Sequence, residues 1–280
     1  MTKSKIIALC GKGGVGKTSI SAMLVKILMS EGRRILSIDA DPAVGFATAL
    51  GIEPERTIND IRNDVIDAAR RGERNSHESN VAGLDYSVFE AMVEAQGFAF
   101  LAIGRPETEG CYCRVNEYLR AIIEELSAKF DYVIVDGEAG IEQINRRVME
   151  SVTHLLLVSD ASRKGINVVR TIKDVADGGV MAYDRVGAIL NRVHSPEDIE
   201  HVDLGGIELL GWFGEVDGIR QRDIQDVPLL TMPDDDAVLD ELRAAMVRFG
   251  VIGGEKRCFP LTSTRRRESR LRCKRRGRQP

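Results

Sequence analysis

The chain has 280 residues, 43% hydrophobic and 29% charged, with a formal net charge of −4 at pH 7, which allows one large α/β domain or two small ones. No apolar run reaches the roughly 20 residues that span a bilayer, and the first one, residues 6–10, is too short for the core of a signal peptide. We therefore expect a cytoplasmic protein without a membrane span.

Short apolar runs recur along the chain, each followed by a turn and a longer helical pattern. Nearly continuous runs of this kind are typical of parallel strands covered on both faces. We predict strands at 5–10, 34–39, 98–103, 131–136, 154–159, 185–191 and 207–213, helices at about 17–30, 114–128, 141–151, 163–176 and 235–249, and surface helix and loop at 53–83. The alternation predicts an α/β fold with a single doubly wound, mostly parallel sheet flanked by helices and with ligands at the carboxyl ends of the strands.

The segment "GKGGVGKT", residues 11–18, matches the phosphate-binding pattern G-x-x-x-x-G-K-[ST]. It follows a predicted strand and opens a predicted helix, which is the context that the pattern requires. Its glycines let backbone N–H groups face phosphate oxygens at a helix N-terminus. Lys17 is expected to reach the β- and γ-phosphates of ATP or ADP, and Thr18 to give its hydroxyl to Mg²⁺. The predicted nucleotide-binding residues here are Gly11, Lys12, Gly13, Gly14, Val15, Gly16, Lys17, Thr18 and Ser19.

A second lysine, Lys12, stands inside this loop. The resulting K-G-G-x-G-K-T resembles the deviant Walker A motif of the SIMIBI-type P-loop NTPases, which include the nitrogenase iron protein and the septum-site and partition ATPases. In that family the extra lysine crosses a dimer interface to the partner's nucleotide. The resemblance implies a homodimer in which Lys12 and Lys17 are catalytic, Lys12 acting on the transferring phosphoryl group as an arginine finger does.

Two further strand ends carry acidic residues. "IDADP" ends the second predicted strand with Asp39 and Asp41, and "DYVIVDGEAG" ends another with Asp136, followed by Gly140. The resemblance implies that Asp41 orients or deprotonates the attacking water in switch I, and that Asp136 holds a water bound to Mg²⁺. It also places the backbone N–H of Gly140 near the γ-phosphate in switch II. The predicted magnesium residues are therefore Thr18, Asp39 and Asp136.

One strand end is a candidate for binding the nucleotide base. "AILNR" ends a later predicted strand with Asn191 and Arg192. In the family an asparagine at this place hydrogen-bonds the adenine ring, and residues 229–243 resemble the stretch whose Pro-Asp turn passes the base. Residues 213–223, "FGEVDGIRQRD", depart from the family pattern, so the adenine contacts after residue 210 stay open.

The segment "EGCYCRVNEYLR" places Cys111 and Cys113 one residue apart. In a reducing compartment, five cysteines favour metal or redox chemistry over disulfides. One C-x-C supplies two ligands, whereas structural Zn²⁺ takes four and Ni²⁺ accepts a square-planar thiolate set. A twofold dimer supplies both cysteines twice, so the homodimer that Lys12 implies would also complete a Ni²⁺ or Zn²⁺ site.

Together with "DGEAGIEQINRR", which starts at Asp136, this segment resembles the CooC family of nickel-insertion ATPases, which serve carbon monoxide dehydrogenase, and their acetyl-CoA synthase relatives. The resemblance covers about residues 4–249. It implies an ATP-hydrolysing nickel-insertion chaperone in which ATP closes the dimer and reshapes the thiolate site. Hydrolysis would then release the ion to a nickel enzyme client such as carbon monoxide dehydrogenase.

Other interpretations of the two thiols stay open, namely free buried cysteines, a vicinal redox pair and an iron–sulfur cluster shared between chains. The cluster would make the chain an ATP-driven iron–sulfur reductase component, but residues 136–147 hold no cysteine to complete it. A MinD/ParA-like spatial-organising ATPase is a further alternative. Cys10 is expected to be packed in the core, and the four histidines show no metal-site spacing.

The C-terminal residues differ from the rest of the chain in charge. Residues 255–280 carry 11 Lys/Arg and 2 Asp/Glu, a balance of +9, whereas the other 254 residues, with 28 basic and 41 acidic, carry −13. We expect an ATPase domain over residues 1–250 and a basic, disordered tail over 251–280. Attachment to nucleic acid or an anionic membrane is the alternative for the tail. It lacks the apolar face of an amphipathic helix, and nucleic acid is not expected as a partner.

Overall fold

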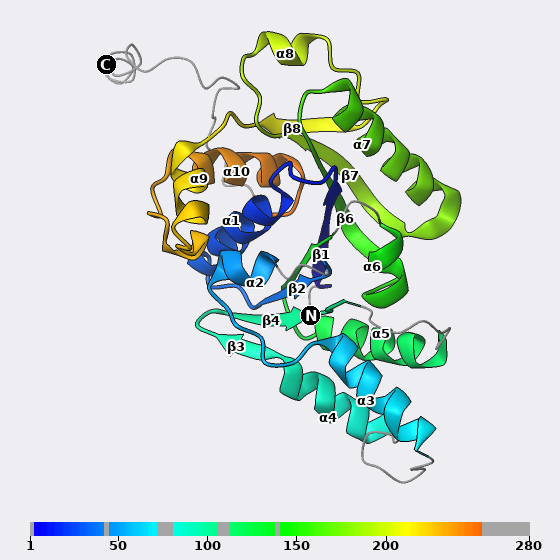
Figure 1. Cartoon of the computed structure of the whole chain (residues 1–280). Helices are drawn as coiled ribbons and strands as arrows, with labels where there is room; N and C mark the ends of the chain where they lie inside the picture. The colour runs from blue at the N-terminus through cyan, green and yellow to red at the C-terminus, as the bar shows by residue number, and fades with distance from the viewer. Residues whose placement is uncertain (1–2, 42–44, 72–80, 106–112, 138–140, 254–280) are drawn as a thin grey trace, which may run out of the picture.

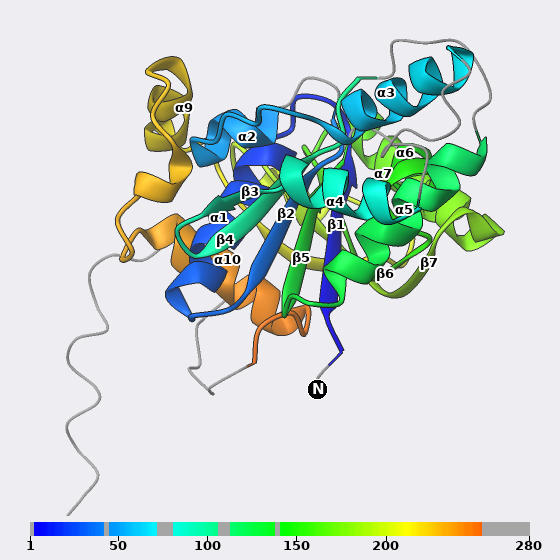
Figure 2. The same cartoon turned by 90° about the horizontal axis from the view of Figure 1, so that it is seen from below.

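The computed structural model describes residues 3–41, 45–71, 81–105, 113–137 and 141–253. Within them, one sheet of eight strands lies between two layers of helices (Figures 1 and 2). The strands are β1 (Lys5–Gly11), β2 (Ile35–Asp39), β3 (Val93–Ala95), β4 (Phe98–Ala102), β5 (Tyr132–Asp136), β6 (Ser151–Ser159), β7 (Ala182–Leu190) and β8 (Glu208–Trp212). Their order across the sheet is β3-β4-β2-β5-β1-β6-β7-β8.

The predicted α/β fold with a mostly parallel sheet is confirmed. Each predicted strand is present within a few residues of its expected bounds, and among the described strands only β3 and β4 pair antiparallel. Burial on both faces explains the continuous apolar runs. On β1, Ala8 and Cys10 face one helical layer, whereas Ile7 and Leu9 face the other. The three-residue β3 was not predicted, because so short an edge strand carries little sequence pattern.

The helices divide between the two faces of the sheet. Residues of α1, α2 and α10 pack on one face, and residues of α3, α4, α5, α6 and α7 pack on the other (Figure 2). The helices are α1 (Lys17–Ser30), α2 (Gly45–Leu50), α3 (Ile58–Arg70), α4 (Val81–Ala91), α5 (Cys113–Ser127), α6 (Glu142–Arg147), α7 (Arg163–Val175), α8 (Glu197–Glu200), α9 (Asp217–Ile224) and α10 (Ala237–Arg248).

A polar side chain caps the start of each of two long helices. Ser162 accepts a hydrogen bond from the backbone N–H of Gly165 at the start of α7, and Asp236 accepts one from that of Val238 at the start of α10. The helix expected at 141–151 is shorter than predicted. It ends at Arg147 because β6 already begins at Ser151.

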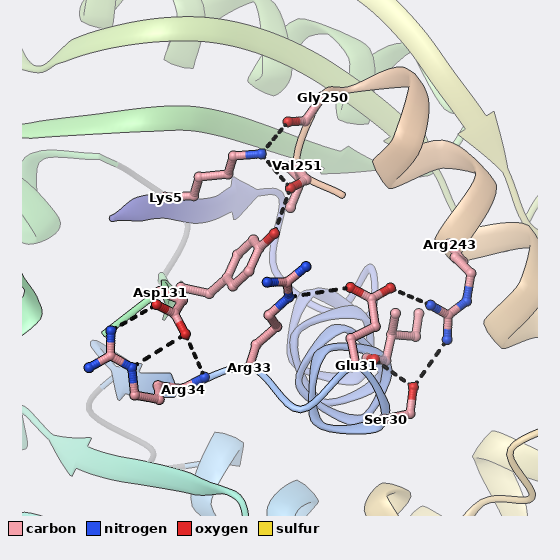
Figure 3. Close-up of polar contacts among 11 residues, drawn as sticks. Lys5, Ser30, Glu31, Arg33, Arg34, Asp131, Arg243, Gly250 and Val251 are labelled. Carbon is pink, nitrogen blue, oxygen red and sulfur yellow. Dashed lines mark hydrogen bonds and ion pairs between the residues drawn. The ribbon is translucent and has the colours of Figure 1, made fainter. Parts of the chain in front are cut away.

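Contacts at the amino ends of the strands anchor the last described residues (Figure 3). Nζ of Lys5 donates to the carbonyl oxygens of Gly250 at 2.9 Å and Val251 at 2.8 Å. The hydroxyl of Tyr132 donates to the same Val251 carbonyl at 3.0 Å, and Val251 is fully buried. The chain is thereby held at the opposite end of β1 from the glycine-rich loop. Residues 254–280, which hold most of the predicted basic tail, lie outside the described residues.

Candidate functional site

The loop between β1 and α1 requires glycine at two close approaches. Gly11 has φ 150°, and a Cβ built on it would lie 1.9 Å from the carbonyl oxygen of Val158 on β6. Gly16 has φ 91°, and a Cβ there would lie 2.5 Å from Nδ2 of Asn191. A side chain at either position would collide with the ends of β6 or β7, and both φ values disfavour other residues. The glycines therefore let the loop lie against the sheet with the N-terminus of α1 behind it.

Lys17 lies beneath this loop and is 8% exposed. Its Nζ donates to the carbonyl oxygens of Gly11 at 3.1 Å and Lys12 at 3.2 Å. The ammonium group is therefore held at the N-terminus of α1, where the helix field also favours an anion. This placement fits the predicted contact between Lys17 and the phosphates of a nucleotide.

Asp136 ends β5 directly below the first turn of α1. Its Oδ2 accepts a hydrogen bond from Oγ1 of Thr18 at 2.7 Å, and its Oδ1 accepts one from Oγ of Ser21 at 2.9 Å. The residue is 1% exposed, and burial raises the pKa of its carboxyl to about 6 despite the two hydroxyl donors. The predicted magnesium residues Thr18 and Asp136 are thus in direct contact.

Asp39 ends β2 beside Asp136, because the strand register pairs the two residues. Its carboxylate accepts hydrogen bonds from the backbone N–H groups of Asp41 at 3.0 Å and Phe46 at 2.9 Å. Burial, and then the charge of Asp136, raises the pKa of Asp39 to about 7. The Thr18 hydroxyl, the carboxyl group of Asp136 that it contacts and the carboxyl group of Asp39 on the neighbouring strand supply the oxygen donors that Mg²⁺ prefers. The residues present therefore fit the predicted magnesium site.

Lys12 has a partner within the same chain. Its Nζ lies 2.6 Å from Oδ2 of Asp160, the residue that follows β6. Burial raises the pKa of Asp160, but the hydrogen bonds from Lys12 and Ser162 outweigh it and hold this pKa below its usual value. Lys12 would therefore have to leave Asp160 before it could act on a nucleotide held by a second subunit.

A cavity of about 730 Å³ opens beside α1 and contains the residues predicted to contact the base. Asn191 and Arg192 line it, together with Ser19 and the segment that departs from the family pattern, including Glu215. The amide of Asn191 also donates from Nδ2 to the carbonyl oxygen of Val15 at 2.8 Å. The cavity therefore adjoins the glycine-rich loop and has the volume of a small-ligand site.

The structure describes only some of the residues that the sequence predicts for the site. Gly140 and Cys111 lie outside the described residues, and Cys113 is described only by its place as the first residue of α5. Within the described parts of the chain, no group of three or more His, Cys, Asp or Glu side chains could hold a metal ion. The Ni²⁺ or Zn²⁺ site at the two cysteines therefore stays a prediction.

Two side chains of this site, Ser21 and Asp160, were missed in the sequence. Ser21 stands three residues after Thr18 on α1, so both hydroxyls lie on one helix face and reach Asp136. Asp160 follows the predicted strand 154–159 directly. The strand-end rule that selected Asp39 and Asp136 would have found it.

The raised pKa of Asp136 gives a prediction for stability. Its carboxyl has a pKa of about 6 when folded and about 3.9 when unfolded, so the folded state binds more protons between these values. The contribution of this group therefore becomes less favourable as pH rises from about 4 to 6, and it stays unfavourable above that. Asp136→Asn should stabilise the nucleotide-free protein by about 1–3 kcal/mol at pH 7.5, and by less than half as much at pH 4.5.

Urea unfolding at the two pH values, without Mg²⁺ or nucleotide, measures this difference. Ser21→Ala serves as a control that removes one donor to Asp136 without removing its charge. An equal effect of Asp136→Asn at both pH values would contradict the titration.

The site combines a strand, a glycine-rich loop with a buried lysine, and a helix whose first-turn hydroxyl binds a carboxylate. This combination defines a P-loop nucleotide-binding protein. The AAA domain family matches residues 4–178, and the chain belongs to that family. Within it, the chain is a P-loop ATPase of the MinD/ParA (SIMIBI) type.

Curated relatives cover most of the chain. An uncharacterised ATP-binding protein of Methanocaldococcus jannaschii is 35% identical over 240 residues, which are 83% of this chain and 93% of the relative. The carbon monoxide dehydrogenase accessory protein CooC of Rhodospirillum rubrum is 29% identical over 203 residues, 69% of this chain and 76% of CooC. The septum site-determining protein MinD of Bacillus subtilis is 29% identical over 157 residues, 55% of this chain and 52% of MinD.

Solved structures confirm the fold. The septum site-determining protein MinD of Pyrococcus horikoshii, complexed with Mg-ADP, has a TM-score of 0.62 and 21% identity and covers 86% of this chain and 94% of its own. The cell division ATPase MinD of Pyrococcus furiosus has a TM-score of 0.64 and 22% identity, and the match covers 89% of this chain and 100% of that MinD chain. Among the described residues, no helix is long and apolar enough to cross a membrane.

Proposed function

We propose that this ATPase is a nickel-insertion chaperone that binds Ni²⁺ at Cys111 and Cys113 of two subunits and delivers it to an enzyme of the carbon monoxide dehydrogenase or acetyl-CoA synthase type. The relative CooC, whose name links it to carbon monoxide dehydrogenase, supports this proposal at 29% identity over 69% of the chain. The C-x-C segment at Cys111 and Cys113, which resembles that of the CooC family, is its second support.

The observation that carries the proposal is where this segment attaches. It joins the carboxyl end of β4 to the start of α5, and β4 is the neighbour of β2, which ends in Asp39. In the order β4-β2-β5-β1, three strand spacings separate β4 from β1, the strand that leads into the glycine-rich loop. This is about 14 Å. Metal and nucleotide would therefore bind at the same edge of the sheet.

The proposed reaction uses residues of both subunits. The glycine-rich loop and Lys17 bind the phosphates, and Asp41 orients the attacking water and takes its proton. As the water oxygen bonds to the γ-phosphorus, the bond to the β–γ bridging oxygen breaks and its electrons stay on ADP. Lys12 of the partner subunit stabilises the charge on the transferring group. Mg²⁺ held near Thr18, Asp39 and Asp136 would neutralise phosphate charge when bound.

Anaerobic titration with Ni²⁺ and Zn²⁺, with and without ADP or ATP, tests this function while the oligomeric state is followed by light scattering. We expect about one ion per dimer, because two C-x-C segments supply the four ligands of one site. Cys111→Ser and Cys113→Ser should each abolish this binding and leave nucleotide affinity within about twofold, since neither residue belongs to the glycine-rich loop.

Cys258→Ser, which changes a cysteine of the basic tail, is the matched control and should retain the bound ion. Full retention of metal by Cys111→Ser would refute the proposed site. A brown protein after anaerobic purification would instead support the iron–sulfur reductase alternative, whereas a colourless zinc form fits the C-x-C site.

A second candidate function is spatial organisation, as in the MinD relatives. The similarity to septum site-determining proteins in sequence and fold favours it, and the +9 balance of residues 255–280 suits an anionic surface. Binding to DNA or to anionic vesicles that is lost above about 0.3 M salt, with no metal bound at the cysteines, would select this function over nickel insertion.

A further inference from the structure

Ser21 is a polar residue on the buried side of α1. It is 0% exposed, and its chain neighbours Ile20 and Ala22 are buried and apolar. A hydroxyl in such surroundings is unfavourable unless it makes a hydrogen bond. A serine inside a helix can bond to the carbonyl oxygen one turn back, but here Oγ of Ser21 donates to Oδ1 of Asp136 at 2.9 Å. The hydroxyl therefore joins α1 to the end of β5.

Two hydroxyls of α1 hold the carboxyl group of Asp136 between them. Oδ2 accepts from Thr18 at 2.7 Å, and Oδ1 accepts from Ser21. The two donors stand three residues apart and so lie on one face of the helix. A carboxyl group bonded at one oxygen can still turn about its Cβ–Cγ bond, whereas two bonds to one helix fix its plane. Ser21 therefore sets the direction in which Oδ2 meets Thr18.

Asp39, the neighbouring strand-end acid, is held in a different way. Its carboxylate accepts hydrogen bonds from backbone N–H groups of the chain that follows it. The side-chain hydrogen bonds of Asp136 within the described residues come from Thr18 and Ser21 instead. Thr18 is itself one of the predicted magnesium residues, so its oxygen is needed by the ion. Ser21 is the donor that can keep Asp136 in place whether or not Mg²⁺ is bound.

We propose that Ser21 is a positioning residue for Mg²⁺. It holds the carboxyl group of Asp136 against Thr18, so that the oxygens of both residues are in place before the ion and the nucleotide bind. Ser21 acts through Asp136 and is not a catalytic residue. Residues that orient metal-binding side chains in this way typically change metal affinity by about 10- to 100-fold when they are removed. The proposal rests on the P-loop ATPase class and does not depend on nickel insertion.

The affinity for a fluorescent ADP analogue, followed as Mg²⁺ is added, measures this role without turnover. In EDTA, Ser21→Ala should bind the analogue within about twofold of the parent, because the glycine-rich loop and Lys17 are unchanged. The Mg²⁺ concentration that gives half of the tightening should rise about tenfold or more. The Mg²⁺ concentration for half-maximal ATP hydrolysis should rise equally, while the rate at saturating Mg²⁺ stays within about threefold of the parental rate.

Two further variants separate positioning from packing. Ser21→Cys fills the same buried volume with a weaker donor, so it should raise the half-maximal Mg²⁺ concentration as well, although it leaves no cavity. Ser30→Ala is the matched control, because the hydroxyl of Ser30 lies in the last turn of α1 and donates to the carbonyl oxygen of Ile27 at 2.7 Å. It should keep the parental Mg²⁺ dependence. Melting temperatures in EDTA show which variants are folded.

Two results would overturn the role of Ser21. One is a half-maximal Mg²⁺ concentration within about twofold of the parental value in folded Ser21→Ala or Ser21→Cys. The other is an ADP affinity that falls equally with and without Mg²⁺, since a serine that only supports the packing of α1 on the sheet would act in this way. A protein that binds no Ni²⁺ would refute the proposed nickel function and leave these expectations unchanged, because the predicted magnesium residues include no cysteine.

Discussion

Lys17→Ala is expected to lower the rate of ATP hydrolysis by about 10²- to 10³-fold, as the loss of a preorganised charge at a transferring group does in other enzymes. Lys17 is 8% exposed, and its ammonium group is held under the loop by the carbonyl oxygens of Gly11 and Lys12. It therefore needs little reorganisation to meet a phosphate. Lys12 cannot replace it within the chain, because Asp160 holds that side chain.

Release of phosphate from ATP in saturating Mg²⁺ measures this loss. Lys173→Ala changes a lysine on α7 that pairs with Asp177 and should hydrolyse ATP at the parental rate. The melting temperature of Lys17→Ala should change little, because the two carbonyl groups it leaves can bind water. Hydrolysis by Lys17→Ala within a few-fold of the parental rate would remove Lys17 from the catalytic residues.

The architecture of the sheet was predictable because burial on both faces leaves a direct mark on the sequence. The strands that end in Asp39 and Asp136 are nearly continuous apolar runs closed by an acid. A carboxylate at the end of a buried parallel strand has few places to lie other than the carboxyl edge of the sheet. The register that puts Asp39 beside Asp136 follows from that topology.

Contacts between distant elements were not predictable. The ion pair of Lys12 with Asp160 joins residues far apart in the sequence, and neither residue type indicates the other. The same holds for Arg62 and Asn116, which a sequence pattern assigns to two polar helix faces. Such pairs depend on how helices pack on the sheet, which periodicity leaves open.

The role of a single motif residue, Asn191 at the predicted base site, was also not predictable from the sequence alone. Asn191 was selected because an asparagine at this strand end contacts adenine in the family. In this structure its amide also holds the glycine-rich loop through Val15. A motif names the residue type but not which of two nearby partners it satisfies, so the role of Asn191 at the base stays a prediction.

The strongest test of the dimer is a mixture of two inactive variants. Lys12→Ala and Asp136→Asn should each hydrolyse ATP at about 1% of the parental rate or less. If Lys12 acts across the interface, a mixed dimer has one complete site. There, the Lys12→Ala subunit keeps its own Lys17, Thr18 and Asp136, and Lys12 comes from the Asp136→Asn subunit.

Random pairing at equal concentrations makes half of the dimers mixed, and each mixed dimer has one competent site of two, so the mixture should recover up to about a quarter of the parental rate. Lys12→Ala mixed with the double variant Lys12→Ala/Asp136→Asn is the control and should recover none, because neither subunit can then supply the lysine. The ion pair with Asp160 makes the outcome decisive. A Lys12 that stays bound to Asp160 and acts only within its own chain would leave both mixtures equally inactive, and the trans role would be excluded.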